Sequence, residues 1–389
     1  MTRKLIYCDT IADYRGILAS PGAILIDGYE VIAVGLPEEI GTTGVHPIRV
    51  HGLVTPPFVN VHSHLDLSGI GIQPPENSFV SWIENTIAPI RKTSSENEMH
   101  AATQRGIELS LAGGTAMVGD IASTVAVAKQ VRESVLGGVS FVEVFGLGSR
   151  ETLAIDAINA MPCEFGISPH APYSCGSEVF RKAFESGKPI ATHLAELPEE
   201  FEATMKHVGS LVEFSKKIGA WNDQVKKWDN NPIDTIVGHL DQRKLIAAHL
   251  NYIEDHHLEL LANTNITVAY CPRASAYFGH KNHRYEEMLS CGVSVALGTD
   301  SLICLDTPDR ISVLDEMRFL YQQGFTDPSV LLNMATVNGA AALGVNPSLL
   351  TLERGSVAGL LLMVSQAEST FDQVMQSNDK PTWLLPLLS

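Results

Sequence analysis

The sequence predicts an α/β fold, namely a (β/α)8 TIM barrel at residues 55–347 with a small β-sandwich domain built from residues 1–54 and 348–389. Two observations carry this prediction. Eight short apolar runs alternate with longer segments of helical periodicity along the middle of the chain, whereas both ends contain short β-type runs. A doubly wound parallel sheet is the alternative, but no G-x-G-x-x-G pattern follows a predicted strand.

The N-terminal segment contains the clearest hairpin. In "AILIDGYEVIAVG", two apolar runs flank Asp27-Gly28, a pair typical of tight turns between antiparallel strands. The eight strands predicted after it are "FVNVH", "GTAMVGD", "VSFVEVFG", "CEFGISPH", "PIATHLAE", "LIAAHLN", "ITVAYCP" and "VSVALGTD". From about Ser348 short apolar pieces return, as in "GSVAGLLLMV", and we expect them to join the N-terminal hairpins.

Helical signals fill the intervals between these strands. In "TPDRISVLDEMRFLYQQ", the apolar side chains of Ile311, Leu314 and Met317 recur about every 3.6 residues, which predicts a helix. In "DPSVLLNMA", Asp327 is the predicted N-cap, and the proline that follows stands at the first helical position. Strands that alternate with helices in this way favour a parallel barrel.

The composition restricts the partners of the protein. Its 389 residues are 45% hydrophobic, and the formal net charge is -17. Such a charge argues against a nucleic-acid polymer or an anionic membrane surface as partner. No apolar run approaches the roughly 20 residues that span a bilayer, and the N-terminus lacks the apolar core of a secretory signal. The six cysteines are scattered without C-x-x-C spacing, so we expect reduced thiols and a cytoplasmic protein.

The stretch "VNVHSHLD" ends a predicted strand with two histidines. Side chains of a strand alternate between its faces, so His62 and His64 project to the same side. Alone, this pattern is more typical of partly buried histidines than of a metal site. Other predicted strands also end at a histidine or an acid, namely His170, His193, His249 and Asp300. Because the carboxyl ends of barrel strands open onto one face, we expect these side chains to converge.

These residue types favour metal chemistry. Neutral imidazole nitrogens and a carboxylate oxygen suit zinc, or iron, which binds similar ligands. Three histidines and one carboxylate leave a coordination position for water, whose pKa a bound cation lowers toward neutrality. Asp66, two residues after His64, is expected outside the ligand set, because it lies in the loop that leaves the strand.

Six motifs occur in the order found in a known family: "VNVHSH", "SPHAPYS", "ATHLAE", "AAHLN", "CPRASAYFGH" and "VALGTDS". From Leu53 to Gly344 the chain therefore resembles the amidohydrolase superfamily, in its branch of metal-dependent deaminases and chlorohydrolases. The resemblance implies that Glu196 is the proton shuttle, that His249 binds or orients the metal water, and that His170 faces the substrate. It also implies four metal ligands, namely His62, His64, His193 and Asp300.

The resemblance bears on the cofactor and the mechanism as well. Binuclear members of the superfamily carry a carboxylated lysine on the fourth strand, but here that strand ends "GISPHAPYS", which favours a single ion. The expected cofactor is one divalent metal ion, zinc first and iron as the alternative.

In the expected reaction, a metal-bound hydroxide attacks an electron-poor carbon while Asp300 and His249 hold the hydroxide by hydrogen bonds. Glu196 carries the proton to the ring nitrogen and then to the leaving amine.

The expected function is hydrolytic deamination of a small aminated heteroaromatic compound, either an adenine-type nucleoside such as aminodeoxyfutalosine or a free base. The "CPR…AYFGH" pattern resembles the aminodeoxyfutalosine deaminases, although Ser275 stands where that subgroup commonly has a histidine. Trp82 is expected either to stack on a substrate ring or to pack within the protein. Arg273 is expected to pair either with a substrate carboxylate or within a salt bridge of the protein.

Two other functions stay open. A triazine-type chlorohydrolase would use the same metal site with a different leaving group, and a non-catalytic relative would keep the fold as a binding protein. A cyclic-amide hydrolase is disfavoured, because the fourth strand lacks the lysine. The expected partner is a small molecule, with no nucleic-acid polymer and no membrane, and a homodimer is left open.

Further polar residues are expected outside the site. His256 and His257 follow "NYIED" at a predicted helix start and are expected to be a solvated pair. His280 and His283 lie in the loop after the seventh strand, and whether they reach the site is left open. The acids of "ELPEEFE" are expected at the surface, in the first turns of a helix, where carboxylates favour the positive end of the dipole: Glu199, Glu200 and Glu202.

Overall fold

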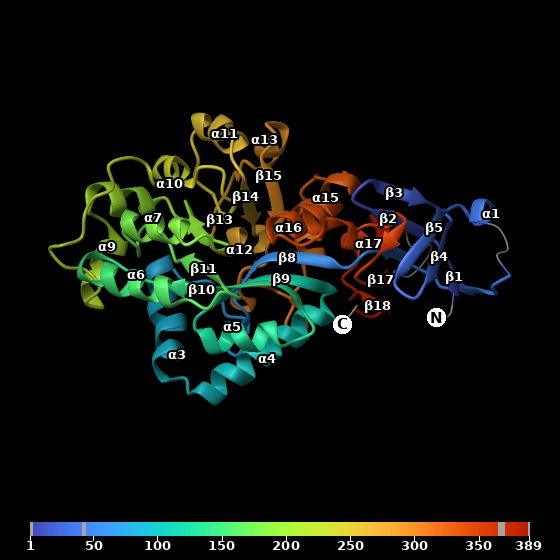
Figure 1. The fold of residues 1–389 in the computed structure, drawn as a ribbon, viewed down its shortest axis with the longest axis horizontal. Coiled ribbons are helices and arrows are strands. Elements are labelled where there is room, and N and C mark those ends of the chain that lie inside the picture. The colour runs from blue at the N-terminus through green and yellow to red at the C-terminus, as the bar shows by residue number, and fades with distance from the viewer. Residues whose placement is uncertain (1–2, 41–43, 365–369, 388–389) are drawn as a thin grey trace.

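Two parallel sheets form the centre of the computed structural model, which describes residues 3–40, 44–364 and 370–387 (Figure 1). Each sheet has four strands, in the orders β8-β9-β10-β11 and β12-β13-β14-β15. All neighbouring strands within these sheets run parallel. The strands are β8 (Phe58–Ser63), β9 (Thr115–Ala122), β10 (Gly137–Val144), β11 (Gly166–Pro169), β12 (Ala191–Leu194), β13 (Leu245–His249), β14 (Ile266–Tyr270) and β15 (Ser294–Leu297).

Each of the eight predicted apolar runs overlaps one of these strands. Strand order within each sheet follows the chain, unlike a doubly wound sheet, in which the order reverses at a switch point. Single parallel bridges join the edges of the two sheets, between Ser63 and Asp300 on one side and between Ile167 and Ile190 on the other. The carboxyl ends of β8 and β15 are therefore neighbours.

Helices occupy the intervals between the parallel strands and lie around the two sheets (Figure 1). In α14, Leu314, Met317 and Leu320 are fully buried along one face, as the 3.6-residue period predicts. At α15 the Asp327 side chain accepts the N–H groups of the next turn, with Pro328 at the first position, which confirms the predicted cap.

The helical segments of this part of the chain are η1 (Leu65–Leu67), α2 (Phe79–Trp82), η2 (Ile83–Ile87), α3 (Ala88–Thr93), α4 (Glu96–Ala112), α5 (Val125–Arg132), η3 (Gly148–Arg150), α6 (Glu151–Ala160), α7 (Ser177–Glu185), α8 (Glu199–Phe201), η4 (Glu202–Lys206), α9 (Ser210–Lys217), α10 (Pro232–Leu240), α11 (Asp255–Ala262), α12 (Pro272–Tyr277), α13 (Tyr285–Ser290), η5 (Leu302–Cys304), α14 (Val313–Gln322), α15 (Pro328–Ala335), α16 (Val337–Ala342) and η6 (Pro347–Leu350). Of these, η2 and η4 are single turns of π-helix, a form that occurs frequently at functional sites.

Two further five-stranded sheets combine the beginning and the end of the chain, at one end of the molecule (Figure 1). Their orders are β16-β5-β4-β1-β6 and β18-β17-β7-β2-β3. The predicted hairpin is present, since β4 and β5 pair antiparallel around Gly28, whose φ of 63° favours glycine. C-terminal strands join N-terminal ones, because β16 pairs with β5 and β17 pairs with β7.

The elements of this second part are β1 (Arg3–Cys8), β2 (Thr10–Asp13), β3 (Gly16–Ala19), β4 (Gly22–Asp27), β5 (Glu30–Gly35), α1 (Pro37–Ile40), β6 (Pro47–Arg49), β7 (Leu53–Thr55), β16 (Gly355–Ser356), β17 (Leu360–Met363), α17 (Phe371–Gln376) and β18 (Thr382–Leu385).

The main hydrophobic core joins the parallel strands to the surrounding helices. It includes Phe180 and Phe184 of α7, Leu240 of α10, Val268 of β14 and Met317 of α14. Burial of such side chains contributes roughly 25 cal/mol per Å² of apolar surface, so this core holds the strands, and with them the strand ends, in place. None of the helices in the described ranges combines the length and the apolar character that crossing a membrane requires.

Candidate metal centre

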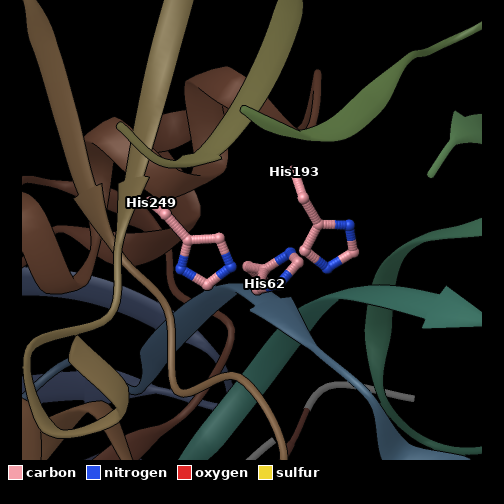
Figure 2. A group of neighbouring side chains, drawn as sticks. All are labelled: His62, His193 and His249. Atoms are coloured by element: carbon pink, nitrogen blue, oxygen red, sulfur yellow. The ribbon is translucent and has the colours of Figure 1, made fainter. Parts of the chain in front are cut away.

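Polar side chains from four parallel strands meet at one place. His62 lies in β8 with His64 just after it, His193 lies in β12, His249 ends β13, and Asp300 follows β15. Potential ligand atoms of His62, His193 and His249 lie within 4.8 Å of one another, and so do those of His62, His64 and Asp300. Figure 2 shows the rings of His62, His193 and His249 directed toward one another from three strands. The structure thus brings together the residues expected to bind a metal.

The spacing within this group is short. Nε2 of His64 lies 3.2 Å from Nε2 of His193 and 3.5 Å from Oδ1 of Asp300. The ring of His62 lies edge-on to the rings of His64 and His193, at centroid separations of 5.1 and 4.9 Å. All four residues are at most 7% exposed. One ion at the centre of this group would therefore be within reach of every member and shielded from bulk water.

Burial keeps these imidazoles neutral. It lowers the pKa of His62 and of His64 well below the ordinary value of 6.5, and it lowers the pKa of His193 to about 4. Nδ1–H of His193 donates to the backbone carbonyl of His170 over 2.9 Å, which leaves a free electron pair on Nε2. A neutral imidazole with a free electron pair is the form that binds metal ions.

Several buried ring nitrogens in this cluster have no hydrogen-bond partner among the described residues. These atoms are Nδ1 and Nε2 of His62, Nδ1 of His64 and Nε2 of His249. Buried polar atoms are normally satisfied, so unpaired nitrogens beside a carboxylate indicate a cation-binding site. Imidazole nitrogens with one carboxylate fit a divalent ion of the zinc type.

Glu196 lies beside this cluster, in the turn after β12. Its Oε1 is 3.6 Å from Nε2 of His249. Burial, and then the charge of Asp300, raises the pKa of Glu196 well above the ordinary value of 4.5. Burial also raises the pKa of Asp300 to about 6. A buried carboxyl group with a raised pKa keeps its proton to a higher pH than an exposed one, which suits a group that acts as a general acid.

Four residues at the ends of β12, β13 and β15 have a left-handed backbone. They are Ala195, His249, Leu250 and Asp300, with φ values of 47°, 74°, 49° and 57°. Non-glycine residues avoid this region, and where they occupy it they cluster at functional sites. The sequence gives no hint of this conformation, because none of the four positions is a glycine.

Side chains from neighbouring strand ends hold the backbone of the site. Nδ2 of Asn251 donates to the carbonyl oxygen of Glu196 over 3.0 Å, and Oγ of Ser275 donates to Oδ1 of Asn251 over 3.0 Å. Oγ of Ser63 donates to the carbonyl oxygen of Asp300 over 3.0 Å. Ser275, which departs from the subgroup pattern, thus fixes the asparagine that holds Glu196.

A cavity of about 490 Å³ opens beside the cluster. One part of its wall is polar and contains His64, His193, Glu196 and Asp300. The other part is apolar and comes mainly from α2, η2 and α9, through Phe79, Trp82, Ile83, Ile87, Leu211, Phe214 and Ile218. A cavity of this size, largely apolar with a few polar groups at one end, suits a small organic molecule.

His170 and Trp82 both line this cavity. Nδ1 of His170 lies 2.7 Å from Oγ of Ser174, and the ring lies 4.6 Å from the ring of Phe145. Trp82 is 8% exposed and packs edge-on against Phe278 at a centroid distance of 5.0 Å. Trp82 therefore contributes to the cavity wall and to the packing of α2 at once.

The structure does not bring Arg273 to the cavity wall. Its guanidinium pairs with the buried Glu316, Nε to Oε1 at 2.7 Å, and with Asp306 at 2.9 Å. Arg273 is 6% exposed, and it is absent from the described residues that line the cavity. The alternative left open by the sequence, a salt bridge within the protein, is the one observed. Asp66 likewise pairs with an arginine, Arg91, at 3.6 Å.

Two expectations about surface residues are wrong. Glu200 is 3% exposed, because its carboxylate turns back to accept the N–H of Ala195 over 2.8 Å. His257 is fully buried, and its Nδ1 accepts the N–H of Glu254 at the start of α11. Among their neighbours, Glu199, Glu202 and His256 are exposed as expected.

The two loop histidines take different positions. Nε2–H of His283 donates to the carbonyl oxygen of His249 over 2.7 Å, so His283 holds the backbone of His249 in place. His280 lies 2.9 Å from the hydroxyl of Tyr252 and is not among the described cavity-lining residues.

Sequence reasoning missed three charged residues of the cavity wall. Glu143 lies within the run "VSFVEVFG" and pairs with Arg91 at 3.3 Å, and both line the cavity. Arg150 lines the cavity at its rim, with its guanidinium donating to the carbonyl of Gly219. Glu143 is an acid one residue before the end of β10, and an acid close to a strand end is a signal of the kind that Asp300 gives after β15. Nothing in the sequence around Arg91 or Arg150 indicates their positions.

Comparisons with known proteins show the family to which the chain belongs. The profile of the amidohydrolase family matches residues 53–379. The chain is 28% identical to the 5-methylthioadenosine/S-adenosylhomocysteine deaminase of Pyrococcus furiosus over 333 residues, which cover 80% of this chain and 74% of that protein. It is 26% identical to the aminodeoxyfutalosine deaminase of Deinococcus radiodurans over 376 residues, which cover 88% of this chain and 86% of that protein.

Two solved structures share the fold. The aminofutalosine deaminase of Helicobacter pylori, in complex with methylthio-coformycin, superposes with a TM-score of 0.77 at 17% identity, covering 98% of both chains. The atrazine chlorohydrolase of Arthrobacter aurescens, in a mutant form complexed with zinc and atraton, superposes with a TM-score of 0.72 at 17% identity, covering 98% of this chain and 95% of that one. With its strand-end histidines, its buried carboxylates and a family match across most of its length, this chain belongs to the amidohydrolase family.

Proposed function

We propose that this protein is a metal-dependent hydrolytic deaminase of a small aminated heteroaromatic compound. The observation that carries the proposal is the convergence of four buried histidines and Asp300 on one point, with Glu196 beside them and a cavity in front. The deaminases among its relatives support the same reaction class.

The proposed cofactor is one divalent metal ion, with zinc first and iron as the alternative. His62, His64, His193 and Asp300 would hold it. Nε2 of His64 lies 3.2 Å from Nε2 of His193 and 3.5 Å from Oδ1 of Asp300, and a ring nitrogen of His62 lies within 4.8 Å of the ligand atoms of His64 and Asp300. When bound, such an ion supplies a Lewis acid that lowers the pKa of water and so provides a nucleophile at neutral pH. The fourth parallel strand, β11, contains no lysine, which supports a single ion.

Glu196 is the proposed proton carrier. Its carboxylate would take a proton from the attacking water, pass it to the ring nitrogen beside the reacting carbon, and deliver a proton to the amine as the carbon–nitrogen bond breaks. The net reaction adds water, forms a carbonyl group and releases ammonia. His249, 3.6 Å from Glu196, and Asp300 would orient the water by hydrogen bonds.

The cavity supports an adenine-type nucleoside, such as aminodeoxyfutalosine, in preference to a free base. Its volume of about 490 Å³ exceeds the need of a single heteroaromatic ring, and residues of α9, including Leu211 and Phe214, line its apolar part. We propose that His170 contacts the ring end of the substrate and that Trp82 flanks it. Arg150, at the rim, would face a polar group at the far end of the substrate.

We further propose that the eight parallel strands close into one (β/α)8 barrel at residues 55–347, and that residues 1–54 and 348–389 form the β-sandwich. The bridges at both edges of the parallel sheets support closure. All six cysteines are free, which supports a reducing, cytoplasmic compartment.

A substrate panel tests the function. Purified protein loaded with zinc, and separately with iron, is incubated with adenosine-, guanine-, cytosine- and triazine-type compounds, including aminodeoxyfutalosine and 5-methylthioadenosine. Ammonia and chloride release are measured separately. We expect ammonia release, fastest with a nucleoside. Chloride release alone would replace the deaminase by a triazine-type chlorohydrolase, and binding without turnover would identify a non-catalytic relative.

A further inference from the structure

The turn between His193 and Glu196 has to place two functional groups within one short segment. β12 ends at Leu194, and Ala195 follows with a left-handed φ of 47°. A residue with a β-carbon avoids this conformation, so it persists only where the surroundings determine it. Ala195 is 7% exposed, so water cannot readily satisfy its backbone groups.

Glu200 supplies the contact that holds this turn. Its Oε1 accepts the N–H of Ala195 over 2.8 Å, and Glu200 itself is 3% exposed. The carbonyl oxygen of Ala195 accepts the N–H of Tyr252 over 3.2 Å, so both backbone groups of this left-handed residue are satisfied. Glu200 is itself anchored, because Oγ of Thr204 donates to its carbonyl oxygen over 2.8 Å.

An acid near the start of a helix has an ordinary explanation, which is interaction with the helix dipole. Glu199, at the start of α8, and Glu202, at the start of η4, fit that explanation because they are exposed. Glu200 does not, since burial of a carboxylate is unfavourable unless a specific contact compensates. The contact that it makes is with the turn that carries His193 and Glu196.

We propose that Glu200 is a positioning residue, which fixes the left-handed turn at Ala195 and thereby sets the relative placement of His193 and Glu196. This inference rests on the proposed function, in which His193 binds the metal and Glu196 carries the proton. Glu200 does not line the cavity among the described residues, and it acts through the backbone.

Three variants at this position and one beside it test the inference. E200Q keeps an oxygen acceptor at the same reach, E200D keeps the acid but shortens it by one methylene, and E200L removes the acceptor at similar volume. E199Q is the matched control, because Glu199 is the exposed neighbour with the same chemistry. Thermal unfolding establishes that each variant is folded, and E200D serves in place of E200L if the latter does not fold.

The readouts are the affinity for Co²⁺, the visible absorption spectrum of the cobalt-loaded protein, and kcat and KM on the best substrate of the panel. We expect E200L and E200D to weaken Co²⁺ binding and to lower kcat by about 10- to 100-fold, with an altered cobalt spectrum and little change in KM. E200Q should show the smallest loss of Co²⁺ affinity and of kcat among the three variants. E199Q should have the same Co²⁺ affinity, spectrum and kcat as the unmutated protein.

A folded E200L or E200D variant with unchanged cobalt affinity, spectrum and kcat would overturn the positioning role. So would an E200Q variant as impaired as E200L, because the carboxylate charge, and not the acceptor, would then matter. Failure of the unmutated protein to bind Co²⁺ at all would instead overturn the proposed function, and the positioning role with it.

Discussion

Oε1 of Glu196 lies 3.6 Å from Nε2 of His249. Glu196 reaches this position from the turn after β12, and His249 from the end of β13, the neighbouring strand of the same parallel sheet. Both residues are buried, at 5% and 2% exposure. A carboxyl group with a raised pKa beside a neutral imidazole, at the edge of a candidate metal site, is an arrangement suited to moving protons.

Glu196→Gln should abolish turnover while leaving the metal in place. The amide has the size of the carboxyl group but cannot take up and release a proton near neutral pH, so we expect kcat to fall by about 10²- to 10⁴-fold. Metal analysis and steady-state kinetics on the same preparation check this, with E199Q as the exposed control. Substantial residual activity in a metal-loaded variant would exclude Glu196 as the proton carrier.

His283 should support His249 through its backbone. His283→Phe keeps the stacking on Tyr270, now 3.8 Å between ring centroids, but removes the Nε2–H that donates to the carbonyl oxygen of His249. We expect His283→Phe to lower kcat by about tenfold. His283→Gln keeps a hydrogen-bond donor and should lower kcat by less. If both variants lose thermal stability equally and keep full kcat, the contact is structural alone.

The two arginines Arg273 and Arg150 should behave in opposite ways. Arg273→Leu leaves Glu316 buried without its partner, so we expect a loss of about 3–5 kcal/mol in the free energy of unfolding. Arg150→Ala, at the exposed rim, should change that free energy by no more than about 0.5 kcal/mol but should raise KM. Urea unfolding and kinetics separate the two effects, and an unchanged KM for R150A would remove Arg150 from substrate binding.

His257 should make the stability of the protein depend on pH. Burial, and then the neighbouring His256, lowers its pKa below 6.5, while the carboxylates of Asp234 and Glu254 oppose this shift. The unfolded chain therefore takes up a proton at this residue at a higher pH than the folded chain does. Its contribution to stability is complete above pH 6.5 and is lost as the pH falls below that value.

His257→Gln should accordingly weaken the decline of the free energy of unfolding between pH 6.5 and acid conditions. His239→Gln, at an exposed position in α10, is the control and should leave the pH dependence unchanged. Urea titrations at a series of pH values measure the slope. Equal slopes for the unmutated protein and H257Q would contradict the assignment of this contribution to His257.

The strands and the main features of the site are predictable from the sequence for physical reasons. Buried parallel strands are short and apolar, so runs such as "LIAAHLN" stand out from their surroundings. Carboxyl ends of parallel strands meet at one face, so the histidines that end these runs were expected to converge, and His62, His193 and His249 do so.

The remaining features depend on contacts between distant parts of the chain. Arg273 meets Glu316 across 43 positions, and Arg91 meets Glu143 across 52, which no local pattern records. Glu200 stands in an acidic run that is typical of an exposed helix, yet its side chain accepts the N–H of Ala195 over 2.8 Å, a contact that the acidic run does not indicate. Local sequence predicts elements and their ends, but it does not predict which buried charge pairs with which.

Metal content tests the central claim most directly. The protein and its His62→Ala and His64→Ala variants are purified alongside His239→Ala, dialysed against zinc, and analysed for bound metal and for fold. We predict about one ion per chain in the unmutated protein and in H239A, and loss of metal and activity together in the other two variants, which should stay folded. Normal metal content in both H62A and H64A would contradict the proposed centre and leave these histidines as buried residues at a strand end.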